Sequence, residues 1–145
     1  MYLLDTNIVS LFDPGRTGEA GPLIQWMREH DPLLFLSTIA MTEIEAGILK
    51  LIRERKDARA RQLAALRDGL IADFGDRLLP LDVAVALTVA HLAEAARPTV
   101  IERTDLIIAA TAKAHGLTVL TRNVRHFEPT GVPTIDPLRA LPRGR

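Results

Sequence analysis

The segment MYLLDTN, Met1–Asn7, begins with apolar residues typical of a buried strand and ends in three small polar residues. Tyr2–Leu4 predicts a first strand, with Asp5 directly at its carboxyl end. In parallel α/β sheets, the carboxyl ends of the strands form the crevice where ligands bind. Taken alone, Asp5 is about equally well interpreted as a binding residue or as a turn or helix-capping residue. The choice depends on which other acids reach the same end of the sheet.

Strand-like and helical segments alternate along the rest of the chain. Further strands are predicted at 33–37, 78–82 and 117–121, with an edge strand at 132–136. Helical patterns cover 7–12, 19–30, 38–55, 63–71, 83–96 and 104–116. We expect Ser37 and Thr104 to cap the helices that follow them. The alternation predicts a layered α/β fold with a mostly parallel sheet, as a single domain over residues 1–145.

The sequence also predicts which faces of the helices are buried and which are solvated. Helical spacing places Leu23, Met27 and Trp26 on the inner face of one helix, and Ile52 on the inner face of the next. The charged stretch RERKDARARQ, Arg53–Gln62, is interpreted as a solvated helix-turn-helix surface rather than an RNA-binding patch, because its acids offset its bases.

Composition excludes several classes of protein. Apolar residues make up 48% of the chain and aromatic residues 4%, which predicts an aliphatic core. The formal net charge of +0 argues against a protein that coats DNA through overall basicity. Without cysteine there is no disulfide, thiol nucleophile or zinc–thiolate site. No signal peptide or membrane-length apolar run is visible, so we expect a cytoplasmic protein with no membrane association.

Further acids stand where they could meet Asp5. Asp105 lies at the start of a predicted helix, where an acid is also favoured by the helix dipole. Within TEIEAG, Glu43 and Glu45 are equally plausible by spacing alone. The polar segment TRNVRHF, Thr121–Phe127, follows a predicted strand. Carboxylates that share a pocket raise one another's pKa unless a cation neutralises them, and oxygen ligands suit Mg²⁺.

Four blocks in this order resemble one family. They are LLDTN at the start, TEIEAG with Glu43 four residues before Gly47, TDLIIAATA with Asp105, and TVLTRNVRHFEPTGV after it. Together they resemble the PIN-domain ribonucleases, and most of all the VapC/FitB-type toxins of bacterial toxin–antitoxin pairs. The resemblance extends over almost the whole chain.

The resemblance implies a three-layer α/β/α sandwich and an endoribonuclease that depends on Mg²⁺ or Mn²⁺. It implies that Asp5, Glu43 and Asp105 are the metal-binding acids, which selects Glu43 over Glu45. A fourth polar catalytic position of the family corresponds to Asn123 here. At His126 the sequence differs from relatives that carry an acid just before the phenylalanine. Donation to a phosphate is one role for this residue, and we favour its interpretation as a surface histidine.

Other residues near these positions receive supporting roles. We expect Thr6 to cap the first helix, and the side chains of Thr6 and Asn7 to hold the Asp5 carboxylate. Arg122 and Arg125 are candidates to hold flanking phosphates of an RNA substrate, with simple surface solubility an equally good interpretation.

The resemblance also implies partners. Related toxins form homodimers and bind a small antitoxin protein that covers the helical surface and blocks the acidic pocket. Leu11, Phe12 and Trp26 could form the antitoxin groove, although we favour placing them in the core.

Two other functions are consistent with parts of the sequence. A phosphotransferase with Asp5 as nucleophile is disfavoured, because DTN stands where such enzymes carry a D-x-D pair. A non-catalytic RNA-binding or regulatory module is disfavoured because a negative pocket repels RNA.

Overall fold

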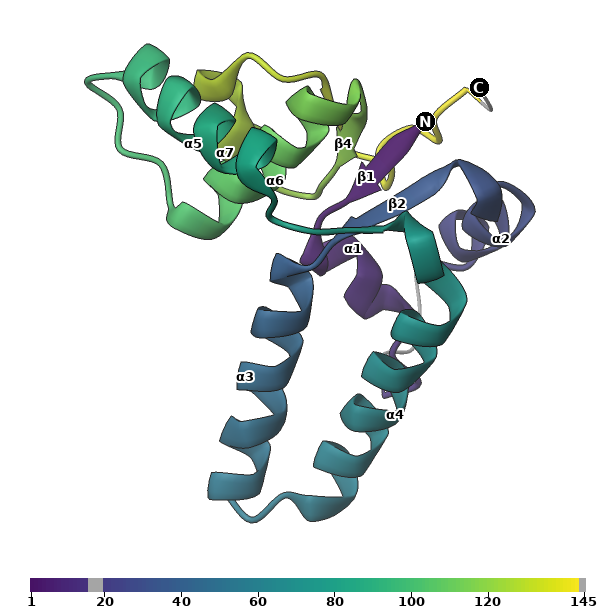
Figure 1. The fold of residues 1–145 in the computed structure, drawn as a ribbon. Coiled ribbons are helices and arrows are strands. Elements are labelled where there is room, and N and C mark those ends of the chain that lie inside the picture. Colours follow the sequence, from purple (N-terminus) through teal and green to yellow (C-terminus); the bar gives the residue numbers. More distant parts are fainter. Residues whose placement is uncertain (16–19, 144–145) are drawn as a thin grey trace.

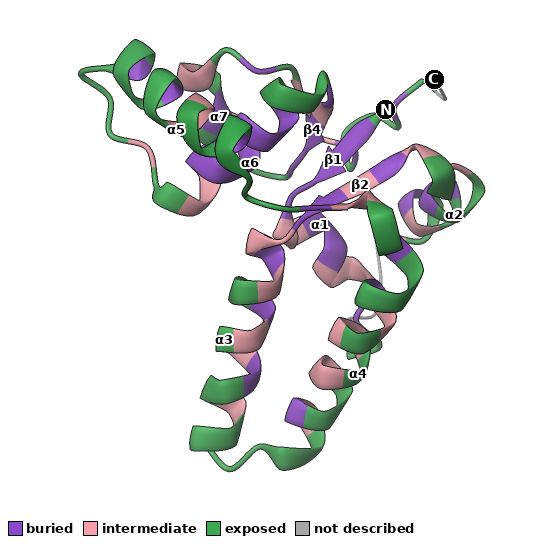
Figure 2. Cartoon of the chain, viewed as in Figure 1, coloured by how far each residue is buried: buried purple, intermediate pink, exposed green. Residues whose placement is uncertain are grey.

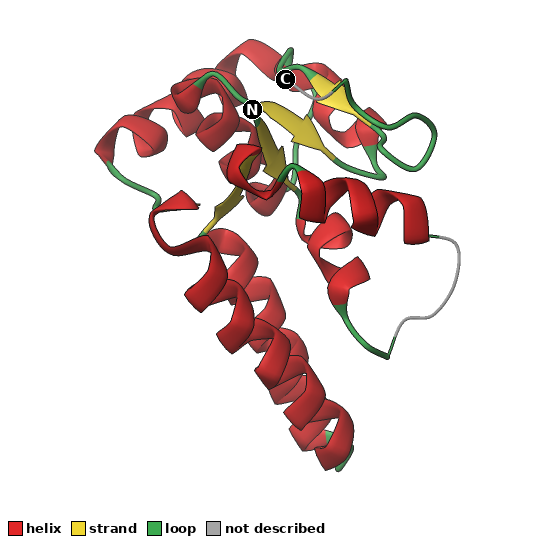
Figure 3. Ribbon diagram, turned by 90° about the vertical axis from the view of Figure 1, so that its right-hand side faces the viewer, coloured by secondary structure: helices red, strands yellow, loops and turns green. Residues whose placement is uncertain are grey.

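The structure of the protein is a computed structural model, which describes residues 1–15 and 20–143. Its centre is a five-stranded sheet in which every pairing between the described strands is parallel (Figures 1 and 3). The strands are β1 (Tyr2–Leu4), β2 (Leu34–Ser37), β3 (Leu78–Leu79), β4 (Thr118–Leu120) and β5 (Thr134–Ile135). The predicted parallel α/β fold is therefore confirmed.

The order of the strands places β1 at the centre of the sheet. Across the sheet the order is β3-β2-β1-β4-β5, and Tyr2 pairs with Leu34 of β2 on one side and Thr118 of β4 on the other. The chain builds outward from β1 to β3, then returns to the other side of β1 to form β4. This reversal between β1 and β4 is a topological switch point, where the carboxyl ends of the strands leave a crevice open for a ligand.

Helices cover both faces of the sheet. The α-helices of the described residues are α1 (Thr6–Val9), α2 (Gly21–Glu29), α3 (Ile39–Arg53), α4 (Asp57–Phe74), α5 (Val83–Ala96), α6 (Arg103–His115) and α7 (Val124–Phe127). Short 3₁₀ helices are η1 (Ser10–Phe12), η2 (Asp31–Leu33), η3 (Gly75–Arg77) and η4 (Glu128–Thr130). The start predicted for the second helix, Glu19, lies outside the described residues.

The alternation of side chains along β1 divides the core in two. Tyr2 and Leu4 point into a cluster with residues of α1, α2, α3 and α4, whereas Leu3 points into a second cluster with α5, α6 and α7. This is the period of two expected of a strand buried on both faces. The two clusters make the fold a three-layer α/β/α sandwich, and the central strand β1 is buried between the helical layers (Figure 2).

Helices α3 and α4 form an antiparallel pair that extends beyond the sheet as an arm (Figures 1 and 3). The charged segment Arg53–Gln62, predicted as a solvated helix-turn-helix surface, forms the tip of this arm, where Arg55 has a positive φ of 59°. The helices approach closely at Gly47, where an added Cβ would lie 3.4 Å from Leu63. Ile44 and Ile48 face the core, but Ile52 is 52% exposed, because the arm has left the sheet at this point.

Several helix starts differ from the expectation. Asp5, not Thr6, is the N-cap of α1, and its side chain accepts a hydrogen bond from the Thr6 N–H. Helix α6 starts one residue earlier than predicted, so Thr104 lies inside its first turn and Glu102 is the N-cap. The N-cap of α3 is Thr38 and not Ser37, which is the last residue of β2, but the Ser37 hydroxyl does accept a hydrogen bond from the N–H of Ile39 in the first turn.

The fold contains no membrane-spanning candidate in its described part. None of the helices within residues 1–15 and 20–143 combines the length and the apolar character that crossing a bilayer requires.

Candidate active site

Asp5 is the buried centre of the site. Its backbone N–H donates to the Leu120 carbonyl at 2.9 Å, which continues the β1–β4 pairing beyond the strands. Asp5 is only 6% exposed, and both of its carboxylate oxygens accept hydrogen bonds. Oδ1 accepts from the Thr6 N–H at 2.7 Å, and Oδ2 accepts from the Thr121 hydroxyl at 2.8 Å. The carboxylate is thus held at the switch point by one group that follows β1 and one that follows β4.

Thr121 lies in the predicted polar segment, but the sequence assigned it no role in the site. It follows β4 directly and is fully buried. Its hydroxyl donates to Asp5 and accepts from the Asn123 N–H at 3.0 Å, so it ties the turn after β4 to the central carboxylate. Asn7 does not hold Asp5 as expected. Its side-chain oxygen instead accepts a long hydrogen bond, 3.4 Å, from the Arg122 N–H.

Glu43 reaches the site from the first turns of α3. The Thr6 hydroxyl donates to its Oε1 at 2.7 Å, so Thr6 joins this acid to the segment that follows β1. Glu45 is directed elsewhere, because it forms an ion pair with Arg67 of α4. The structure therefore separates two glutamates that periodicity alone leaves equivalent.

Asp105 completes the group from the first turn of α6. Its side chain is 15% exposed, and its Oδ2 lies 3.4 Å from Nδ1 of His126. The His126 side chain is 58% exposed, as expected of a surface histidine, but its contact with Asp105 makes it part of the site's edge. Glu102, three residues before Asp105, adds a further negative charge that the sequence interpretation did not include.

Burial raises the pKa of all three acids, and repulsion from neighbouring carboxylates adds to the increase for Glu43 and Asp105. For Asp5 the main cause is burial, which outweighs the hydrogen bonds from Thr121 and Thr6 that lower the pKa. Burial also raises the pKa of Glu43, with Asp5 and Asp105 adding to the increase. The pKa of Asp105 rises through burial and the charge of Asp5, against an opposing effect of His126. The charge of Asp5 thus acts on both Glu43 and Asp105, and that of Asp105 on Glu43, as expected for acids that share one pocket.

The donor chemistry fits a hard divalent cation, because the three converging acids offer only oxygen atoms. Their present geometry is not that of a closed ligand set. Among the residues that the structure describes, no three His, Cys, Asp or Glu side chains are spaced as a ready-made metal site. The Glu43 side chain is exposed and accepts a hydrogen bond from the Thr6 hydroxyl.

The remaining predicted residues are Asn123, Trp26, Leu11 and Phe12, and no contact of their side chains with the three acids is seen among the described residues. Asn123 is exposed and is the N-cap of α7, close to Thr121 through its backbone. Trp26 is buried and stacks on His30, so the core interpretation is correct for it. Leu11 and Phe12 are half-buried against the same cluster.

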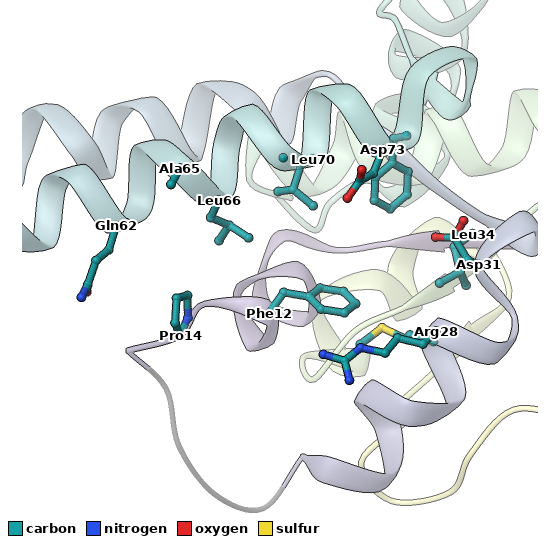
Figure 4. A pocket seen from close by; sticks show the side chains of 13 residues that line it. Phe12, Pro14, Arg28, Asp31, Leu34, Gln62, Ala65, Leu66, Leu70 and Asp73 are labelled. Atoms are coloured by element: carbon teal, nitrogen blue, oxygen red, sulfur yellow. The ribbon is translucent and has the colours of Figure 1, made fainter.

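A separate cavity of about 480 Å³ lies between η1, α2 and α4 (Figure 4). Phe12 points into it, together with Leu66 and Leu70 of α4. Met27 of α2 also lines it. Arg28 and Asp73 add charged groups to its wall. Asp5, Glu43 and Asp105 are not among its lining residues.

Comparison with known proteins agrees with this arrangement. The family model of the PIN domain matches residues 2–131, and the chain belongs to this family. It is 34% identical to the plasmid stability protein StbB of Pseudomonas syringae pv. tomato, covering 97% of this chain and 100% of that protein. It is 32% identical to the toxin FitB of Neisseria gonorrhoeae, covering 94% and 98%. Identity to the VapC ribonuclease Y4jK of Sinorhizobium fredii is 30%, covering 94% and 97%.

Solved structures show the same fold. The FitAcB structure from Neisseria gonorrhoeae superimposes with a TM-score of 0.80 at 31% identity, covering 94% of this chain and 98% of that chain. The structure of DNA-bound VapBC from Salmonella typhimurium gives a TM-score of 0.73 at 26% identity, covering 92% and 96%.

Proposed function

We propose that the protein is an endoribonuclease dependent on Mg²⁺ or Mn²⁺, which acts as the toxin of a toxin–antitoxin pair. The observation that carries the proposal is the convergence of Asp5, Glu43 and Asp105 at the switch point of a PIN fold. Relatives named toxin FitB and VapC ribonuclease support it. Neither rival function has a specific observation in its favour.

In this proposal Asp5, Glu43 and Asp105 would hold the divalent ion. When bound, such an ion supplies positive charge opposite the scissile phosphate and favours attack by water. Thr121 and Thr6 orient the carboxylates of Asp5 and Glu43 through the hydrogen bonds described above.

The polar residues at the edge of the site have the remaining roles. Asn123 would orient the attacking water with its side-chain amide, and His126 positions Asp105 at the edge of the pocket.

The direct test is cleavage of RNA with purified protein, with the product ends identified. A fluorophore–quencher RNA should be cut when Mg²⁺ or Mn²⁺ is present and left intact in EDTA. The products should carry 5′-phosphate and 3′-hydroxyl ends. Cleavage that continues in EDTA, or that leaves a cyclic phosphate, would contradict the proposed chemistry. Mapping of cleavage ends after brief induction in cells would then identify the RNA target.

We further propose that a small antitoxin binds the cavity between η1, α2 and α4 (Figure 4). Complexes of the FitAB and VapBC type among the structural neighbours support a protein partner. The cavity is lined mainly by apolar residues and carries charges at its edge, which suits an amphipathic segment. Of the three residues first considered for such a groove, only Phe12 lines it; Trp26 is buried and Leu11 is not part of the lining.

We also propose a homodimer. An exposed apolar stripe at the start of α5 supports it, with Leu81, Val83 and Leu87 exposed by 49%, 76% and 61%. Light scattering on a Leu87→Glu variant should show a monomer, whereas Val100→Glu, in the loop after α5, should leave the assembly unchanged. A monomeric wild-type protein would rule the dimer out.

A further inference from the structure

A second cavity, of about 690 Å³, lies beyond the carboxyl ends of β4 and β5. Its walls are the segment that follows β4, including Arg122, Asn123 and Arg125, and the segment that follows β5, including Arg139. His126 also lines it and contacts Asp105, so the cavity borders directly on the acidic site. The opening therefore continues from the acids toward the β5 edge of the sheet.

The cavity wall carries cationic groups that no other described residue neutralises. Arg122 and Arg125 are exposed, and within residues 1–15 and 20–143 no carboxylate forms an ion pair with either guanidinium. Other arginines form ion pairs within the protein, as Arg67 does with Glu45. The free pair beside the acids is therefore available for a ligand.

Of the two acids that line this cavity, Asp136 is engaged by neighbouring groups. Asp136 is 16% exposed, accepts a hydrogen bond from the Leu138 N–H and lies 3.6 Å from Nε of Arg139. The guanidinium of Arg139 is attached to a side chain that is 89% exposed, so it can still contact a ligand. Glu128 is the other acid of the wall.

An RNA strand needs such a region. The proposed site gathers negative carboxylates, which repel phosphates, and the chain's formal net charge of +0 gives no overall attraction. Affinity for RNA must therefore come from local contacts between cations and phosphates. Among the residues that the structure describes, the arginines that line this cavity are Arg122, Arg125 and Arg139, and they can supply such contacts.

We propose that this cavity binds backbone phosphates of the RNA on one side of the scissile bond, with Arg122 and Arg125 as the main phosphate contacts and Arg139 at the far end. The strand then passes from the acids over the ends of β4 and β5 and not over the α3–α4 arm. This inference rests on the proposed function and adds the path of the substrate to it. An acidic segment of the antitoxin is the other occupant of similar chemistry, and the experiment separates the two.

The test measures binding of a fluorescein-labelled single-stranded RNA in EDTA, where cleavage is absent, over a series of KCl concentrations. Removal of one phosphate contact from a single strand lowers the slope of log K against log salt by about 0.7. We expect a loss of this size for Arg122→Gln and for Arg125→Gln, close to twice that loss in the double variant, and a smaller effect for Arg139→Gln. The control is Arg61→Gln on α4, exposed and remote from this cavity, which should match the wild type.

The outcomes separate this inference from the proposed function. Variants that lose RNA affinity in a protein that does not cut RNA would support the phosphate site and refute the nuclease. A double variant with wild-type affinity and slope overturns the inference even if the protein is a nuclease, and so does a wild type that fails to bind RNA. A double variant that keeps its RNA affinity but no longer binds the antitoxin shows that the cavity serves the protein partner.

Discussion

The Thr121 hydroxyl donates to Oδ2 of Asp5 at 2.8 Å, although the two residues are 116 positions apart in sequence. They follow β4 and β1, which are neighbours only because the strand order reverses at this point. The contact fixes one carboxylate oxygen, while the Thr6 N–H fixes the other. Parallel pairing of distant strands thus determines the orientation of the central acid.

Thr121→Val should lower RNA cleavage about 10–100-fold, the usual effect of removing a group that orients a metal-binding residue. The fold should persist because valine has a similar shape. The matched control is Thr88→Val on α5, whose hydroxyl donates to the Ala84 carbonyl of its own helix. Initial rates on the quenched RNA would measure the effect, and equal rates for both variants would show that the Asp5–Thr121 contact is irrelevant to activity.

Glu43→Gln and Glu45→Gln form a second matched pair, two residues apart on α3. The first removes the charge that faces Asp5 and Asp105, and we expect RNA cleavage to fall to background. The second removes only the ion pair with Arg67, a half-exposed contact that contributes about 1 kcal/mol or less to stability. Cleavage should therefore survive. Loss of activity in the Glu45 variant alone would reverse the assignment.

The raised pKa of Asp5 predicts how stability varies with pH in the absence of metal. A carboxyl whose pKa is higher in the folded state binds more protons when folded, so its contribution to stability declines as pH rises. The decline starts near the ordinary aspartate pKa of about 4 and continues through the raised folded value. Asp5→Asn removes this decline, so in EDTA the variant should be more stable than wild type at neutral pH.

Urea unfolding of both proteins across this pH range would measure the difference. The advantage of Asp5→Asn should increase with pH and disappear at low pH. A divalent ion should reverse the order, since ligand at 100 times its Kd stabilises the folded state by about 2.7 kcal/mol. A variant less stable than wild type at every pH in EDTA would show that hydrogen bonding, not burial, dominates at Asp5.

Gly69 offers a clean test of the antitoxin cavity. It lies on α4 in the cavity wall, and an added Cβ would have no atom within 4 Å. Gly69→Trp should fill the cavity and abolish antitoxin binding. Gly69→Ala should retain binding and stabilise the helix by about 0.5–1 kcal/mol. Titration calorimetry with the antitoxin would distinguish them, and tight binding by the tryptophan variant would place the partner elsewhere.

Much of the fold can be predicted from the sequence, because apolar runs mark the strands and helices and turn residues mark their ends. The predicted bounds of β1 and of α5, Val83–Ala96, match the structure. Caps are harder to predict, because Asp5 and Thr6 are both good capping residues. The extended backbone of Asp5, with φ −70° and ψ 153°, decides between them.

The site is only partly readable for a related reason. Glu43 and Glu45 have similar helical environments in sequence, and only α4 packing beside α3 gives Glu45 a partner in Arg67. Thr121 resembles an ordinary strand residue until the β1–β4 pairing is known. The position of Glu102 near the site could have been predicted from the sequence, because it lies one helical turn before Asp105.

Diffraction from crystals grown with Mn²⁺, at a wavelength where manganese scatters anomalously, tests the central claim most directly. We predict an anomalous peak about 2.0–2.2 Å from a carboxylate oxygen of Asp5, with Asp105 or Glu43 as a second ligand, and no such peak in Asp5→Asn. Wild-type crystals with no peak at these acids, under conditions in which the protein cuts RNA, would contradict the account.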